Sequence, residues 1–527
     1  MSAPPGPAIE TALQRTALAY DRTPYYSRPF PETRPAHLAA IARLFGLVSP
    51  DVATARVLEI GCSSGGNLIP VAAAFPEARC IGLDLSPLQI AEAQARAANA
   101  GLANIEFRTA SVTEVDASWG TFDYIICHGV YSWVPAEVSH AILRVTAERL
   151  SDRGVAFISY NVLPGWHLRR VARDVMLTHA ARFDEPAQKL TQARAILEFM
   201  KDHAPRDTYY ASILQREATM LAEHRDDYVL HEFLETENNP CSLTDFVTAA
   251  GNAGLGYLGD SEIDIMVPDA HGPQVTAQLR QITAGPVQLE QYLDLLTGRT
   301  FRKSILMKRD TLARWQRAPT ASHMVGLHVA TTFVDPPTPT GPGPFAFKAS
   351  TDDSRTEAFA TLRTASPTIA AALVELGRRW PATATAAELA DWVASDAEPR
   401  EAVLMDVCEA LFGLTMAGML VLSTTPIRVG RADATHPRAA PLVRADAQRG
   451  AADTVSLHHQ RVGLDATARI LLPLLDGTRD RTSLIPAGQK MLALTADDRQ
   501  PDADGTAAAE IIESTLQHLA AVALLVP

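Results

Sequence analysis

The sequence predicts an α/β fold for the first half of the chain and a C-terminal α+β region of helices and short strands. Three observations predict it. Short apolar runs alternate with helical patterns from residue 56 to residue 163, which is typical of a parallel sheet with right-handed crossovers. The first apolar run ends in a glycine-rich turn. A Pro/Gly cluster around residues 335–345 then marks the boundary to a different pattern.

The elements of the first half follow from these patterns in chain order. Apolar positions at helical spacing predict a helix over 37–48, before the sheet. The helix expected over 87–100 begins at Pro87 and ends before Gly101, as helices commonly do. Two further helices are expected at about 66–75 and 135–150. The apolar runs predict strands at 56–62, 79–86, 104–110, 122–130 and 154–163.

The rest of the chain predicts an insertion and two C-terminal units. Helix–strand patterns at 242–263 and 289–309 indicate that the sheet resumes after a mostly helical stretch. Residues 402–426 and 505–527 share one pattern, a helix, a short break and a brief apolar strand, and 427–453 is expected to be loop. We therefore expect an N-terminal lid and sheet core (1–167), a helical insertion (168–236), the end of the sheet (237–310) and two winged-helix-like units (320–430 and 450–527).

Composition narrows the class of protein. The chain has 527 residues, enough for about three domains. Its net charge is −13 and it has no basic tract, so nucleic acid is not an expected partner. The five cysteines form no C-x-x-C pair, which argues against a disulfide framework or a metal site and favours a cytoplasmic location. No signal peptide and no apolar run of membrane-spanning length is present, so no membrane association is expected.

The turn in VLEIGCSSGGNL (57–68) carries the chemical signal. Glycine there lets the backbone approach a ligand closely, but several nucleotide-binding folds use such a turn. The strict G-x-G-x-x-G of dinucleotide sites is absent, and Glu59 stands two residues before Gly61. A carboxylate there suits a cationic methionine moiety better than a pyrophosphate. Asp84 ends the next strand, where it can accept ribose hydroxyls; the alternative for Asp84, or for Ser86, is an ordinary helix cap.

These motifs, E-x-G-C-x-x-G-G followed by D-L-S and FDYIICHGV, resemble the Rossmann-like sheet of class I S-adenosylmethionine-dependent methyltransferases. The segments YDRTPYYSRPFPETRPAHL, HGVYSWVP, SYNVLPGWH, HEFLETENNP and QYLDLLTGRTFRKSIL narrow the resemblance to members with a methyltransferase regulatory domain, a group that includes rickettsial protein lysine methyltransferases acting on an outer-membrane protein. The resemblance covers residues 20–310 well and the C-terminal part loosely.

The resemblance implies S-adenosyl-L-methionine as cofactor and S-adenosyl-L-homocysteine as product. It also implies a set of cofactor-binding residues: Glu59, Gly61, Cys62, Ser63, Gly65, Asn67, Asp84, Leu85, Ser111, Val112 and His128. Two of these depart from the family pattern. Many members have glycine in place of Ser63, and many have an acidic residue, contacting the adenine amino group, in place of Ser111.

The acceptor site is expected at the carboxyl ends of the strands, where ligands bind in open α/β sheets. A lysine acceptor, with a pKa of about 10.4, must lose a proton, which an aromatic pocket favours. His128 or Tyr131 is the expected proton relay, and Tyr25 and Tyr26 are expected to form a lid. Trp133 and Trp166 fit core packing as well as they fit the pocket. The candidate catalytic residues are His128, Tyr131, Tyr25, Tyr26, Trp133, Tyr160 and Trp166.

Three functions stay open. The first is a protein methyltransferase acting on lysine, with the C-terminal units docking the substrate. The second is a small-molecule N- or O-methyltransferase in which the helical insertion closes over a compact pocket. The third is a non-catalytic protein that senses the cofactor. The N/D-P-P-Y/F motif of adenine and glutamine methyltransferases is absent, since CHGV stands in its place, and no acidic metal-ligand cluster is found. A homodimer is an open alternative.

Overall fold

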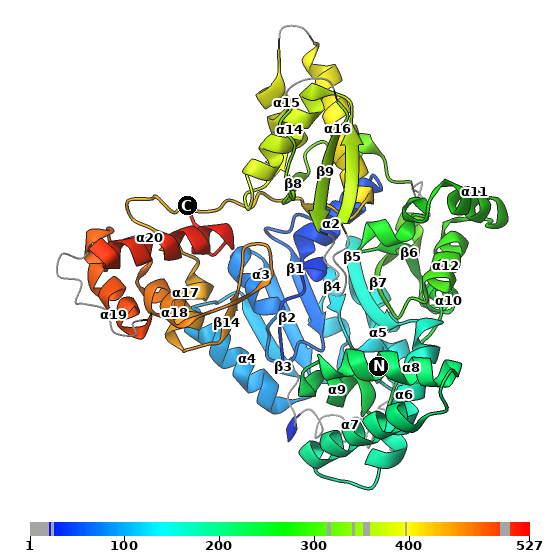
Figure 1. Cartoon of the computed structure of the whole chain (residues 1–527). Coiled ribbons are helices and arrows are strands. Elements are labelled where there is room, and N and C mark those ends of the chain that lie inside the picture. The colour runs from blue at the N-terminus through cyan, green and yellow to red at the C-terminus, as the bar shows by residue number, and fades with distance from the viewer. Residues whose placement is uncertain are drawn as a thin grey trace.

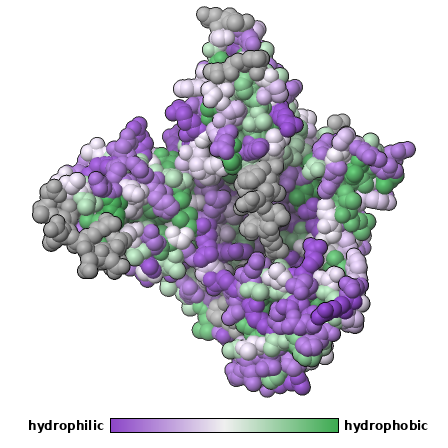
Figure 2. Space-filling model, in the orientation of Figure 1, coloured by the Kyte–Doolittle hydropathy of each residue, from purple (hydrophilic) through white to green (hydrophobic). Residues whose placement is uncertain are grey.

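The computed structural model describes residues 21–22, 26–313, 318–339, 343–350, 359–395, 398–495 and 506–527. A central sheet is surrounded by four groups of helices and short strands, one on each side in the view of Figure 1. The face turned to the viewer in Figure 2 is hollowed over the sheet and mostly hydrophilic there. None of the helices in the described ranges has the length and apolarity that a membrane crossing requires.

The central sheet has seven strands in the order β3-β2-β1-β4-β5-β7-β6. The first five run parallel, and β7 lies antiparallel between β5 and β6. This arrangement confirms the predicted Rossmann-like sheet and its resumption after an insertion. The strands are β1 Arg56–Ile60, β2 Arg79–Asp84, β3 Ile105–Thr109, β4 Phe122–Cys127, β5 Leu150–Asn161, β6 Leu255–Asp260 and β7 Phe301–Lys308.

Helices cover both faces of this sheet. Neighbouring strand residues such as Val57 and Leu58 belong to two different buried clusters, one on each face. The central strands β1 and β4 are buried along almost their whole length because both of their faces are covered, whereas the edge strand β3 keeps exposed residues such as Glu106 and Thr109. The covering helices are α2 Pro35–Leu44, α3 Leu68–Ala74 and α4 Pro87–Asn99 on one face, and α5 Ala136–Arg149 and α10 Leu243–Asn252 on the other. Short 3-10 turns η1 Pro31–Thr33, η2 Val112–Glu114, η3 Ala117–Trp119 and η4 Tyr131–Trp133 lie between them.

The predicted helical insertion forms four helices with a core of their own. They lie below the sheet in Figure 1. The chain then returns through α10 and β6, passes two 3-10 turns, and reaches β7 and a short helix. The helices of the insertion are α6 Gly165–Ala180, α7 Pro186–His203, α8 Tyr209–Ala222 and α9 Asp226–Phe233. Between β6 and β7 lie η5 Ile263–Met266, η6 Asp269–His271, α11 Pro273–Ile282 and α12 Pro286–Thr297, and α13 Arg309–Leu312 follows β7.

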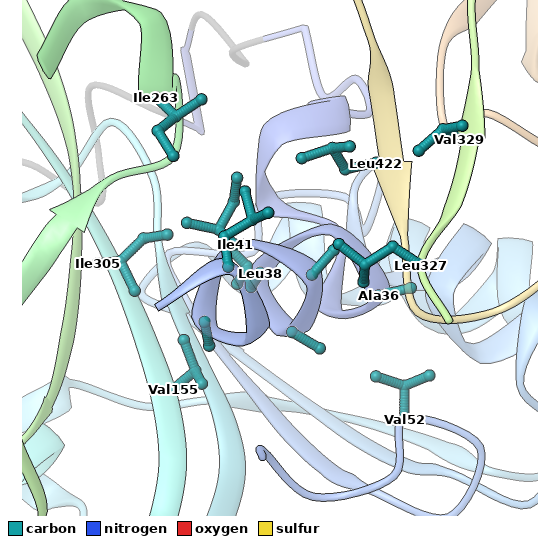
Figure 3. Close-up of a cluster of buried hydrophobic side chains, with 14 of the residues drawn as sticks. Ala36, Leu38, Ile41, Val52, Val155, Ile263, Ile305, Leu327, Val329 and Leu422 are labelled. Carbon is teal, nitrogen blue, oxygen red and sulfur yellow. The ribbon is translucent and has the colours of Figure 1, made fainter. Parts of the chain in front are cut away.

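Helix α2 joins the sheet to the next unit. Leu38 and Ile41 are at most 1% exposed. Figure 3 shows them between sheet side chains on one side and side chains of the following unit on the other, so the two parts share one hydrophobic core. A helix that is apolar all round is expected at such a buried position. The neighbours drawn there include Val155 and Ile305 from the sheet, and Val329 and Leu422 from the following unit.

That following unit lies at the top of Figure 1 and combines helices with short antiparallel strands. Three strands pair in the order β11-β8-β12, and a separate hairpin joins β9 to β10. Its elements are η7 Ala321–Met324, β8 His328–Ala330, β9 Phe345–Ser350, β10 Phe359–Thr364, α14 Pro367–Arg378, β11 Ala384–Thr385, α15 Ala386–Val393, α16 Arg400–Met416 and β12 Val421–Ser423.

The C-terminal unit corrects one prediction. Residues 427–453 are not all loop, because residues 441–448 form helix α17. Leu442 and Val443 are buried, and Val443 packs into the core of this unit. This segment is rich in Arg, Ala and Pro and has few large apolar residues, so its sequence shows no clear helical periodicity. The unit comprises β13 Arg438–Ala439, α17 Pro441–Gln448, β14 Asp453–Val455, β15 Arg461–Gly463, α18 Ala466–Leu471, η8 Leu472–Leu474, η9 Thr482–Leu484, α19 Ile485–Thr495, α20 Thr506–Ala521 and β16 Leu525–Val526.

A buried ionic network holds the antiparallel end of the sheet. The Arg302 guanidinium on β7 donates to both carboxylate oxygens of Asp294, at 2.7 and 2.9 Å. It also donates to Glu290 at 3.1 Å and Asp260 at 3.4 Å. All four side chains are at most 1% exposed. Three buried carboxylates therefore share one buried cation, which joins α12 to β6 and β7, and Asp294 also accepts a hydrogen bond from Arg299 at 2.8 Å.

We expect Arg302→Met to lower the free energy of unfolding by about 3–5 kcal/mol, because it removes the buried cation that the three carboxylates share. Urea denaturation followed by tryptophan fluorescence measures the change. The control is Arg144→Met, which removes a partly exposed pair with Glu148 and is expected to cost less than about 1 kcal/mol. Equal losses in the two variants would contradict this account of the network.

Candidate active site

The loops at the carboxyl ends of β1, β2 and β4 meet around a cavity of about 190 Å³. Side chains from the N-terminal segment, α5, α9 and β7 complete its wall. All but one of the residues predicted to bind the cofactor line this cavity: Glu59, Gly61, Cys62, Ser63, Asn67, Asp84, Leu85, Ser111, Val112 and His128. The exception is Gly65.

Backbone geometry explains the glycines of the β1–α3 loop. Gly61 has φ +76°, and a Cβ there would lie 2.4 Å from Val130 Cγ2. A Cβ on Gly65 would instead lie 2.8 Å from the Phe107 ring and 2.9 Å from Ile69 Cδ1. Gly65 therefore serves packing of the loop against the sheet and helix. Ser63 has φ +49°, a conformation that glycine adopts most easily.

Glu59 places a carboxylate with one unsatisfied oxygen at the cavity. Its Oε1 accepts a hydrogen bond from Asn67 Nδ2 at 2.8 Å. Its Oε2 is buried and has no hydrogen-bond partner among the described residues. Burial raises the pKa of Glu59 to about 8, against the lowering effect of the Asn67 hydrogen bond. A cationic group in the cavity would satisfy this oxygen and favour the ionised form.

Asp84 serves two loops at once. Its Oδ2 accepts the backbone N–H of Ser63 at 2.9 Å, and its Oδ1 accepts that of Ser86 at 3.0 Å. Ser86, rather than Asp84, caps α4 by accepting the N–H of Gln89. Burial raises the pKa of Asp84, which these backbone hydrogen bonds oppose. Each carboxylate oxygen keeps a lone pair for a ligand hydroxyl.

Ser111 lines the cavity but its hydroxyl is engaged locally. It forms a capping box with Glu114 at the start of η2 and accepts the backbone N–H of Thr113 at 3.2 Å. The Ser111 and Thr113 hydroxyls also lie 2.8 Å apart. Leu85 and Val112 line the same part of the cavity wall. This part is therefore more apolar than it would be with a carboxylate at position 111.

His128 lies within an aromatic cluster at the cavity. Its ring centroid is 3.8 Å from that of Phe30 and 5.9 Å from those of Phe157 and Phe301. Its Nδ1 lies 3.1 Å from Ser159 Oγ. Burial lowers the pKa of His128 to about 4, against the raising effect of Glu32. The ring is therefore neutral and weakly basic near pH 7, which makes it a poor proton acceptor.

The other aromatic candidates divide into one cavity residue and a layer behind it. Trp133 lines the cavity. Trp166 packs edge-on against Trp133 at 5.8 Å and is 1% exposed. Tyr131 and Tyr160 pack on Phe246. These last two tyrosines and Trp166 do not line the cavity, and Trp166 packs behind Trp133.

Only one of the two tyrosines predicted to form a lid lies among the described residues. Tyr25 lies outside the described residues. The Tyr26 hydroxyl donates to the carboxylate of Asp453 in the C-terminal unit, and its ring lies beneath Arg225 and Arg461 at 4.8 and 5.1 Å. Tyr26 does not line the cavity. It instead anchors the strap, which we define as residues 26–33.

The strap itself lies on the β1–α3 loop. Ser27 Oγ accepts the backbone N–H of Gly66 at 2.8 Å, and a Cβ on Gly66 would lie 2.4 Å from the Ser27 backbone. Phe30 and Thr33 both donate to Asn67 Oδ1 at 3.0 Å. The strap therefore closes one side of the cavity.

Several residues that line the cavity were not predicted. Glu232 of α9 is one of them, and burial raises its pKa to about 7, against the lowering effects of Arg169, His231 and Arg173. The family-like segment HEFLETENNP contains it, but local sequence does not place a helix of the insertion over the sheet. The other unpredicted lining residues include Ser27, Arg28, Phe30, Gln89, Val130, Val134, Val138, His231 and Phe301.

Three family models match separate parts of the chain. Residues 57–154 match a methyltransferase domain. Residues 225–308 match a model described as a predicted methyltransferase regulatory domain. Residues 435–524 match the C-terminal winged helix domain of PKMT. The last match supports the predicted winged helix and starts before α17.

Two curated proteins of Rickettsia prowazekii are similar over the first part of the chain. Protein RP789 is 44% identical over 292 residues, which cover 55% of this chain and 53% of that protein, so the chain spans about half the length of this relative. Protein RP028 is 39% identical over 234 residues, which cover 44% of this chain and 94% of that protein.

The whole fold is similar to two solved structures of PKMT2 from Rickettsia typhi. One has a TM-score of 0.80 and the other, in complex with AdoHcy, a TM-score of 0.81. Each is 26% identical and the match covers 96% of this chain and 100% of that chain. The similarity therefore extends through the sheet, the insertion and the C-terminal units.

We expect Gly66→Ala to release the strap, because the added methyl group would overlap the Ser27 backbone. Hydrogen–deuterium exchange of residues 26–33 should become at least about tenfold faster, since an overlap that disrupts packing costs about 1–3 kcal/mol. Gly251→Ala is the matched control, because a Cβ there meets no atom within 4 Å. Unchanged exchange of the strap in Gly66→Ala would contradict its close contact with the loop.

Proposed function

Since the chain belongs to the family of S-adenosylmethionine-dependent methyltransferases with a regulatory domain, we propose that it methylates the side-chain amine of lysine in a protein. One observation carries the proposal. Two carboxylates line the same cavity: Glu59, which belongs to strand β1 of the sheet, and Glu232, which belongs to helix α9 of the insertion. The first suits a bound cation of the cofactor and the second suits an incoming amine.

The residues of the sheet edge fit S-adenosylmethionine. The unsatisfied Glu59 Oε2 matches the ammonium of the methionine moiety, and Asp84 stands where two ribose hydroxyls would reach it. The buried Ser63 Oγ also has no partner among the described residues. Leu85 and Val112 offer apolar contact for the adenine. When bound, the cofactor supplies an electrophilic methyl group on a sulfonium.

The protein's own groups would prepare the acceptor. Trp133 offers an aromatic face for an ammonium, and Glu232 offers a negative charge. A base with a pKa near the operating pH transfers protons most effectively, and Glu232 meets this condition whereas His128 does not. The ammonium would give its proton to Glu232. The neutral amine, held beside Trp133, would then be free to receive the methyl group that the bound cofactor supplies.

A protein substrate is favoured by the C-terminal units and the surrounding surface. The chain is similar over 96% of its length to PKMT2. Hydrophilic side chains gather around the centre of the face in Figure 2, which suits a polypeptide better than a small apolar molecule. The second candidate is a small-molecule methyltransferase. It is favoured by α9, whose His231 and Glu232 reach over the cavity as a cover would.

The test is methyl transfer from isotopically labelled S-adenosylmethionine by the purified full chain. Cell extract is separated into proteins and metabolites, and both are analysed by mass spectrometry. We expect label in protein, on the ε-nitrogen of lysine. Label only in small molecules would favour the second candidate and overturn the first. Cofactor binding without label in either fraction would show a non-catalytic protein.

We expect Glu232→Gln to lower kcat/KM for the acceptor by about 10²-fold or more, the usual effect of removing a general base. The wild-type activity should rise with pH through an inflection near 7, because only ionised Glu232 accepts the proton. The variant should lack this inflection and keep the cofactor affinity. The control is Glu185→Gln, which alters an exposed carboxylate of the same insertion. An unchanged pH profile in Glu232→Gln would contradict the assigned role.

A further inference from the structure

We propose that His459, in the C-terminal unit, is a positioning residue of the cofactor site that acts through Asn67 on the carboxylate of Glu59. The inference rests on the proposed cofactor site, and it assigns to that site a residue that lies far from it in the sequence. Three hydrogen-bonded side chains form the connection, and each is at most 4% exposed. His459 stands between β14 and β15, in the turn of the hairpin of the C-terminal unit.

The orientation of the Asn67 amide is decided by its neighbours. The Phe30 backbone N–H lies 3.0 Å from one amide atom, and a backbone N–H only donates, so that atom is the oxygen Oδ1. The other amide atom is the nitrogen Nδ2, which donates to Glu59 Oε1 at 2.8 Å. This hydrogen bond leaves Glu59 Oε2 for a ligand. Asn67 therefore sets which carboxylate oxygen stays unsatisfied.

His459 contacts the same amide oxygen. Its Nε2 lies 2.8 Å from Asn67 Oδ1. Because that oxygen only accepts, Nε2 carries the proton and donates it. Burial lowers the pKa of His459 to about 3, an effect to which Arg34 adds and which Glu32 opposes, so the ring is neutral at physiological pH. Hydrogen bonds to Oδ1 polarise the amide and strengthen the bond from Nδ2 to Glu59.

The hairpin turn is shaped to aim this ring. His459 has φ +61°, a strained region for a residue with a side chain. Ser456 and Gln460 close the turn, since the Ser456 N–H donates to the Gln460 carbonyl at 2.8 Å. The Leu457 N–H donates to the Ala523 carbonyl at 3.0 Å, which fixes the turn to the end of the C-terminal unit. A strained backbone conformation persists only where the surrounding structure holds it, and residues in such conformations cluster at functional sites.

The neighbouring histidine provides an internal control. His458 is as buried as His459, at 3% exposure. It points away from the cofactor loop: its Nε2 lies 2.6 Å from the Pro381 carbonyl oxygen, and its ring stacks on Trp380 at 4.7 Å. Both histidines hold the hairpin in place, but only His459 touches Asn67. A change specific to His459 therefore separates cofactor positioning from general packing.

The experiment measures binding of S-adenosylhomocysteine to the purified full chain by calorimetry. We expect His459→Ala to raise Kd about tenfold, since loss of one buried hydrogen bond costs about 1–1.5 kcal/mol. His459→Gln, which retains a donor, should restore Kd to within about threefold of wild type. His458→Ala should stay within the same range. Thermal unfolding of each variant checks that the fold is retained.

A double-mutant cycle with Asn67→Ala tests the route. If His459 acts through Asn67, the loss of affinity in the double variant should equal the loss in Asn67→Ala alone. Additive losses would overturn the inference, as would wild-type affinity in His459→Ala or equal weakening in His458→Ala. These outcomes differ from failure of the proposed function, which would appear as no binding of S-adenosylhomocysteine by the wild-type chain.

Discussion

The structure depends on one side-chain amide, that of Asn67 at the start of α3. Its oxygen accepts hydrogen bonds from the strap, through Phe30 and Thr33, and from His459 of the C-terminal hairpin. Its nitrogen donates to the buried Glu59. A buried amide must have its polar atoms satisfied, because each unsatisfied group is costly. The first strand of the sheet, the N-terminal segment and the C-terminal unit are thus brought to a single point.

The cavity beside Asn67 is lined by polar groups whose hydrogen-bonding capacity the protein does not fully satisfy. Glu59 keeps an oxygen without a partner among the described residues, and Ser63 has a positive φ. Burial raises the pKa of Glu59, Asp84 and Glu232. Perturbed carboxylates that cluster in one cavity are typical of a site that gains its compensation from ligands. The buried carboxylates around Arg302 are the contrast, since their cation is part of the chain.

The units around the sheet are joined by cores and contacts as well as by chain connections. Helix α2 packs between the sheet and the following unit. Helix α9 brings Glu232 from the insertion to the cavity. Tyr26 joins the strap to the C-terminal unit by its contact with Asp453. The strap and the insertion thus each contribute to the wall of the cavity, and the C-terminal unit contacts the strap.

The sequence by itself determined the parallel sheet and most of the loop residues at its edge. Strand and loop are adjacent in sequence, and parallel strands bring their carboxyl ends to one edge, so Glu59, Asn67 and Asp84 had to lie together. Only the tertiary structure decided which distant groups complete the site. Glu232 and His459 reach the edge by packing of helices and a hairpin across more than a hundred residues of chain. Local sequence patterns do not predict such contacts, because they depend on how the surfaces of separate units fit together in the folded protein.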